Sequence, residues 1–115
     1  MRAPLLALAA ALAASPAHGE QYWARTRITA VSAVADDAKY PQYSRTIYVG
    51  LEDRAWLPKG CREASGLLAS ADDAALLTLA MEALRQGRPV VVKADDARRI
   101  GDYCRLFQIT LYAPE

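Results

Sequence analysis

The chain has 115 residues, with 14 Lys and Arg against 13 Asp and Glu, which gives a formal net charge of +1 at pH 7. Without Arg2, which lies in the export signal described below, the balance is 13 basic against 13 acidic residues. A neutral chain lacks the strongly basic surface on which nucleic-acid binding depends, so we expect no nucleic-acid partner. Two cysteines are too few for a disulfide-dense miniprotein or a four-cysteine zinc site, and we expect no metal.

The N-terminus has the three parts of a secretory signal. A basic residue, Arg2, precedes the ten-residue apolar run Leu5–Ala14, and small residues lie just before position 20. We therefore predict a signal peptide over residues 1–19 and a single exported domain over 20–115, located in the periplasm or outside the cell. The apolar run is too short to cross a bilayer permanently, and no run of about twenty apolar residues follows it. We expect no membrane span after signal removal.

Loss of the signal also removes His18, the one histidine of the sequence. Its absence excludes serine–histidine and cysteine–histidine catalysis in the exported domain, and also histidine metal sites. We therefore expect a protein that is not an enzyme and carries no cofactor. A carboxylate-dependent hydrolase remains as an alternative, because neighbouring acids occur at Asp36-Asp37, Glu52-Asp53, Asp72-Asp73 and Asp95-Asp96.

The first half of the exported domain reads as two strands joined by a loop. Residues 22–34 are rich in β-branched and aromatic types and predict a long strand. Residues 35–42 carry turn chemistry, and residues 43–51 alternate, so a second strand is expected there with Ile47, Val49 and Leu51 facing the core. Residues 52–69 are ambiguous and fit either a third strand or a loop, with Trp56 and Leu57 directed into the core.

A helix follows over about 71–86. Ser70 is the expected N-cap, and Gly87 supplies a left-handed stop. Leu76, Leu77, Ala80, Met81, Ala83 and Leu84 recur at helical spacing and form one broad apolar stripe.

The last third predicts strands at 89–94 and 103–112, separated by a charged loop at 95–102. In the final strand Phe107, Ile109 and Leu111 are expected to alternate inward. One apolar helix face cannot cover two open sheets. The order of elements therefore predicts an α+β domain, a small OB-like five-stranded antiparallel barrel or curved sheet with one helix. An open α+β sheet with the helix across one face is the competing arrangement.

Cys61 and Cys104 form an even pair in a chain expected to reach an oxidising compartment, which predicts one disulfide. They lie 43 residues apart in the sequence. The chain-entropy model assigns roughly 4 kcal/mol to closing a loop of that size.

The second half of the chain also resembles a known group. A cysteine precedes an Ala/Leu-rich helix that ends at a glycine, and a Val-rich strand then precedes a second cysteine that opens the last strand. These parts are Cys61, Ala74–Leu84, Gly87, Pro89–Lys93 and Tyr103–Leu111. The pattern is similar to small secreted bacterial proteins related to the B subunits of subtilase- and pertussis-like AB5 toxins. The resemblance implies an OB-type fold and a ligand-binding role. The sequence has no motif that matches the sugar-contacting residues of those toxin subunits, so the resemblance assigns no binding residues.

Candidate binding residues come from the two loops, which lie near the common ligand face of an OB-type barrel. Tyr40 and Tyr43 flank the first loop and offer rings for sugar stacking or protein contact. Arg98 and Arg99 lie in the second loop and can grip a carboxylate. We therefore expect a non-enzymatic binding protein whose ligand is a glycan or another protein. A structural or inhibitory accessory protein that pairs through a strand edge is the other alternative.

Overall fold

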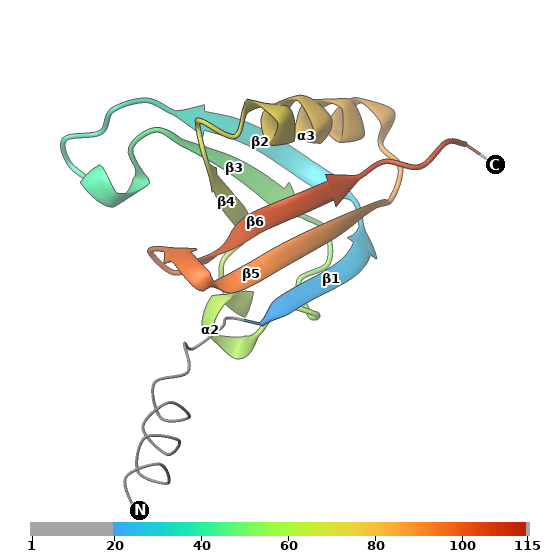
Figure 1. The fold of residues 1–115 in the computed structure, drawn as a ribbon, viewed down its shortest axis with the longest axis horizontal. Helices are drawn as coiled ribbons and strands as arrows, with labels where there is room; N and C mark the ends of the chain where they lie inside the picture. The colour runs from blue at the N-terminus through green and yellow to red at the C-terminus, as the bar shows by residue number, and fades with distance from the viewer. Residues whose placement is uncertain (1–19, 115) are drawn as a thin grey trace, which may run out of the picture.

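The computed structural model describes residues 20–114, so the predicted signal peptide at 1–19 lies outside the described residues. The elements in chain order are β1 (Gln21–Thr26), β2 (Ile28–Val34), η1 (Pro41–Tyr43), β3 (Thr46–Leu51), α2 (Lys59–Arg62), β4 (Gly66–Ser70), α3 (Ala74–Gln86), β5 (Val90–Ile100) and β6 (Tyr103–Thr110). They form an α+β domain with one mixed sheet and one main helix, as Figure 1 shows.

The sheet has six strands in the order β1-β5-β6-β4-β3-β2, which corrects the expected count of five. The long strand predicted at 22–34 is divided at Arg27, so that β1 pairs with β5 and β2 pairs with β3. The expectation of a purely antiparallel sheet is also wrong, because β4 and β6 run parallel. No pairing joins β1 to β2 among the described residues, and the sheet is open between these two strands.

The bend at Arg27 is fixed by the segment that follows β3. The Glu52 amide donates to the Arg27 carbonyl at 2.9 Å, and the Asp53 amide donates to the Thr26 hydroxyl at 3.0 Å. The Arg27 side chain also donates to the Gly87 carbonyl and pairs with Glu52, both at 3.2 Å. These contacts turn one continuous segment toward two different edges of the sheet. Periodicity alone does not reveal such a turn.

The hydrophobic core lies between the inner sheet face and α3. Ile47, Val49 and Leu51 are buried as predicted, and Leu57 is only 1% exposed, with Trp56 packed partly against the same cluster. The ambiguous stretch 52–69 contains the short helix α2 and all of β4 except its last residue, Ser70. From β4, Leu67 and Ala69 are fully buried. Residues from both halves of the chain therefore pack together in a single core cluster.

The helix ends as predicted and begins later than predicted. Gly87 adopts a left-handed φ of 68° and its amide donates to the Ala83 carbonyl, which is the expected stop. Ser70 is the last residue of β4 and not the N-cap; its hydroxyl accepts from the Asp72 amide at 3.2 Å in a turn. The helix therefore begins at Ala74.

The inward alternation predicted for the last strand is wrong at Phe107, whose side chain is 48% exposed. The register passes from Lys93↔Gln108 to Ala94↔Leu106, so Phe107 is an extra residue opposite the partner strand. Such a β-bulge resets the alternation, which places Leu106 as well as Ile109 in the core.

The predicted disulfide is present between Cys61 of α2 and Cys104 of β6, with a Cα–Cα distance of 5.5 Å. Both residues are buried, at 1% and 0% exposure. The bond attaches the segment around α2 to the end of the sheet opposite α3 (Figure 1).

The exposed face of α3 carries an ion pair between Glu82 and Arg85, which gives a pH-dependent prediction. Hydrogen bonds from Arg85 and then from Gln86 lower the pKa of Glu82 from 4.5 to about 2. A lowered folded-state pKa contributes stability above the unfolded value, and this contribution is lost as the pH falls from 4.5 toward about 2.

We therefore expect Glu82→Gln to lower the free energy of unfolding slightly at pH 7 and to have a smaller effect at pH 2, where the carboxyl is partly protonated in the folded protein as well. The effect is small because the Glu82 and Arg85 side chains are 38% and 71% exposed. Urea denaturation of both proteins at the two pH values checks this. An equal loss at both values would contradict it.

Candidate functional site

Three tyrosines surround a hollow on the outer face of β2, β3, β4 and β6. The hollow has a volume of about 320 Å³. We call it the tyrosine groove; its lining residues are Ser32, Val34, Asp37, Tyr43, Thr46, Tyr48, Leu68 and Tyr103. Tyr103 lies edge-on to both Tyr43 and Tyr48, with ring centroids 6.1 Å apart in each pair. The groove therefore combines aromatic rings with hydroxyl groups.

Strand alternation places these rings outside the core. Tyr48 lies between the buried residues Ile47 and Val49, so it points to the opposite face of β3. Its partner across the ladder is Leu68, which is 3% exposed and lies outside the main core cluster. Leu68 therefore forms an apolar floor that the tyrosine rings cover.

The loop that carries Tyr43 is held by its own hydrogen bonds. The Asp37 carboxylate accepts from the Lys39 and Tyr40 amides at 2.9 and 3.1 Å. The Ser44 hydroxyl accepts from the Asp37 amide at 2.7 Å and donates to the Asp37 carbonyl at 3.2 Å. These hydrogen bonds order the loop around Tyr43, whose ring lies against Gly101 in the β5–β6 turn.

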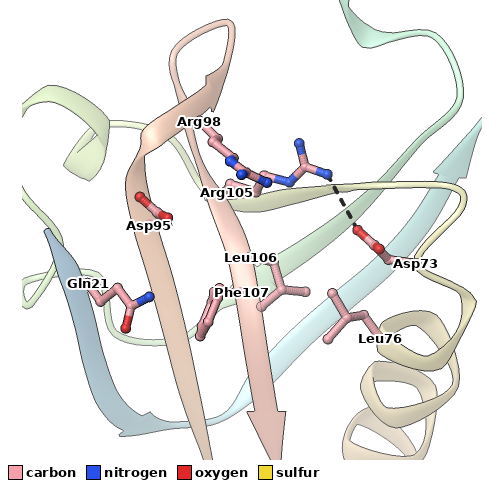
Figure 2. Close-up of a pocket in the computed structure, with 8 residues that line it drawn as sticks. All are labelled: Gln21, Asp73, Leu76, Asp95, Arg98, Arg105, Leu106 and Phe107. Carbon is pink, nitrogen blue, oxygen red and sulfur yellow. Dashed lines mark ion pairs between the residues drawn. The ribbon is translucent and has the colours of Figure 1, made fainter. Parts of the chain in front are cut away.

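A second hollow, of about 410 Å³, lies where β1, β5, β6 and the start of α3 meet; Figure 2 shows it. We call it the charged cleft; its lining residues are Gln21, Asp73, Leu76, Asp95, Arg98, Arg105, Leu106 and Phe107. The Arg105 guanidinium is directed toward Asp73 at 3.5 Å. Two carboxylates share this cleft, and Asp73 is engaged by Arg105.

The four predicted binding residues do not form one site. Tyr43 lines the tyrosine groove and Arg98 lines the charged cleft. Tyr40 is 48% exposed, with the Lys39 ammonium 5.3 Å from its ring centre. Arg99 points away from Arg98, because its guanidinium lies over Gly60 of α2. The two loops nevertheless lie side by side, because the Tyr43 ring contacts Gly101.

Part of the charged loop predicted at 95–102 continues as strand. The β5–β6 register passes from Asp95↔Arg105 to Ile100↔Tyr103, so residues 96–99 form an irregular bulge opposite Cys104, before the turn. This bulge places the side chains of Arg98 and Arg99 in different directions, Arg98 in the charged cleft and Arg99 over Gly60.

In the neighbouring strand β1, a hydrogen bond from the Tyr22 hydroxyl to Glu20 raises the pKa of Tyr22.

Sequence reasoning missed Tyr48 and Tyr103 as members of a site. Both could be recognised as aromatic residues in strands, and the alternation of β3 indicates that Tyr48 points outward. The pairing of β4 with β6, which brings Tyr103 beside Tyr48, has no signal in the local sequence. Recognising Tyr48 and Tyr103 as neighbours therefore requires the order of the strands in the sheet.

Within residues 20–114, none of the helices has the length and hydropathy that a membrane crossing requires. The same part of the chain brings together no group of three or more His, Cys, Asp or Glu side chains suited to a metal ion. Comparison with protein-family models, with curated proteins and with solved structures finds no significant match. The resemblance to AB5 toxin B subunits therefore stays a prediction based on the sequence pattern.

Proposed function

We propose that this chain is a non-enzymatic binding protein of the periplasm or the extracellular medium, and that it holds a glycan in the tyrosine groove. The observation that carries the proposal is the array of Tyr43, Tyr48 and Tyr103 around a hollow of about 320 Å³. Binding clefts for small molecules have volumes of roughly 300–1,000 Å³, with an apolar lining and a few placed polar groups.

The chemistry of the lining suits an uncharged sugar. The flat faces of pyranose rings pack on aromatic side chains, and tyrosine adds a hydroxyl that exchanges hydrogen bonds with the sugar. Ser32 adds an exposed hydroxyl to this lining, whereas the Thr46 hydroxyl is buried and donates to the Tyr43 carbonyl at 2.7 Å. Asp37 is the one charged residue of this lining, so a carboxylate sugar is disfavoured. This proposal therefore departs from the expectation that Arg98 or Arg99 grips an acidic ligand.

We also propose that the fold is OB-like. The strand order supports this if β1 and β2 are counted as two halves of one bent strand, since that strand then borders both β3 and β5. In OB folds the second and third strands and two neighbouring loops form the usual ligand face. Here that face corresponds to β3, β4 and the loops that carry Tyr43 and Gly101.

The experiment is a glycan array probed with oxidised residues 20–115 and, in parallel, with Tyr103→Ala. Tyr103 contacts both other rings, so we expect its removal to weaken retained sugars at least about tenfold. The matched control is Tyr112→Ala, which removes an equally large side chain that is 58% exposed and lies outside the groove.

Tyr103→Phe keeps the ring packing and separates lost binding from lost folding, and a thermal melt of each variant completes the comparison. An array without any retained sugar, or with equal signals from the wild type and Tyr103→Ala, would contradict the proposal.

Edge pairing with another protein is the second candidate, and one observation favours it. Among the described residues, β1 and β2 each pair with a neighbour on one side only. A partner that adds a strand to β2 would lose affinity in Ala33→Lys, which places a charge at an exposed position of that strand. The same partner would bind Tyr103→Ala normally, so these two variants separate the candidates.

A further inference from the structure

The outer face of β1, β5 and β6 combines exposed aromatic rings with cations, separately from the tyrosine groove. Trp23 and Phe107 are 66% and 48% exposed. Register places Trp23 opposite Lys93, and Arg25 lies two residues further along the same face of β1. Arg98 and Arg105 lie at one end, in the charged cleft with Phe107. We call these six residues the aromatic–basic face.

The charge of this face differs from that of the whole domain. It carries four cations, and the charged cleft adds two carboxylates, Asp95 and Asp73, so these groups together have a charge of +2. A fifth cation, Arg88, shares a hollow of about 480 Å³ with Arg25 at the other end. The neutral total therefore conceals an uneven distribution, with a basic face on one side of the sheet.

We propose that the aromatic–basic face docks the protein on the surface of an anionic phospholipid bilayer. The face has separate hollows at its two ends. The exposed ring of Phe107 lies in the charged cleft with Arg98 and Arg105, and the exposed ring of Trp23 lies beside Lys93 and Arg25. Indole and phenyl rings partition to the headgroup region of a bilayer, and arginine and lysine are attracted to anionic headgroups. The basic balance of the face complements such a surface, and its two rings supply the apolar contact.

The test is flotation of oxidised residues 20–115 with phosphatidylcholine vesicles and with vesicles of equal parts phosphatidylcholine and phosphatidylglycerol. We expect binding to the anionic vesicles only, and its loss at high salt, because the Debye length falls from about 10 Å at 0.1 M to about 3 Å at 1 M. Lys93→Gln should weaken partitioning roughly fivefold, the contribution of one cation near an anionic surface.

Trp23→Ser should weaken vesicle binding further, and Arg25→Gln is a second variant if that protein folds poorly. The matched controls are Tyr40→Ser and Lys59→Gln, exposed residues outside the aromatic–basic face. In a Trp56→Phe background Trp23 is the one tryptophan, so its emission should shift to the blue when anionic vesicles are added.

Equal binding to both vesicle types, no binding, or retention on heparin without vesicle binding would each overturn the proposal. None of these results depends on whether the tyrosine groove holds a sugar.

Discussion

Replacing both cysteines, as Cys61→Ala with Cys104→Ala, should lower the free energy of unfolding by about 4 kcal/mol. The bond joins residues 43 apart, so its loss returns a large amount of conformational freedom to the unfolded chain. Both side chains are fully buried, and alanine at these positions leaves unfilled space in addition. For a domain of this size such a loss lowers the melting temperature by at least about 15 °C.

Thermal and urea denaturation of the double variant measure this loss. Wild-type protein unfolded in the presence of a reductant is the matched control, because it breaks the same bond without changing the side chains. A loss below about 1 kcal/mol in both experiments would show that the segment around α2 is held by its other contacts alone.

A comparably large loss is expected for Leu67→Ala. Leu67 is 0% exposed in β4 and pairs across the ladder with Val49, which is also fully buried. Truncating a buried leucine removes apolar contacts and leaves a cavity, at a cost of roughly 2–5 kcal/mol. The next residue, Leu68, forms the floor of the tyrosine groove, so the loss should also loosen the site.

Leu84→Ala is the matched control, since it deletes the same atoms from a side chain of α3 that is 39% exposed. Urea denaturation should give a loss below about 1 kcal/mol for this variant. Equal losses in the two variants would contradict the placement of the core between the sheet and α3.

Features set by local sequence were predicted well. The alternation of β3 identified Ile47, Val49 and Leu51 as core residues, and Gly87 marked the end of α3. The disulfide was also predicted, because an even pair of cysteines in a chain expected to be exported leaves one possible partner for each. These predictions needed only neighbours in the sequence or a count of residues.

Features set by pairing between distant strands were not predicted. The bulge at Phe107 depends on the register of β6 against β5, and the bend at Arg27 depends on hydrogen bonds from the segment after β3. The tyrosine groove follows from the same cause. Tyr103 reaches Tyr48 only because β6 lies beside β4, whereas Arg98 and Arg99 separate because β5 bulges between Asp95 and Ile100.

Amide chemical-shift mapping of ¹⁵N-labelled, oxidised residues 20–115 tests the proposed glycan site most directly. Lactose, maltose and sialyllactose serve as probes, added to saturating concentrations. If the proposal is right, the uncharged sugars shift amides around Tyr43, Tyr48, Leu68 and Tyr103, which line the groove. Shifts confined to the charged cleft, or an unchanged spectrum with every sugar, would contradict a glycan site in the tyrosine groove.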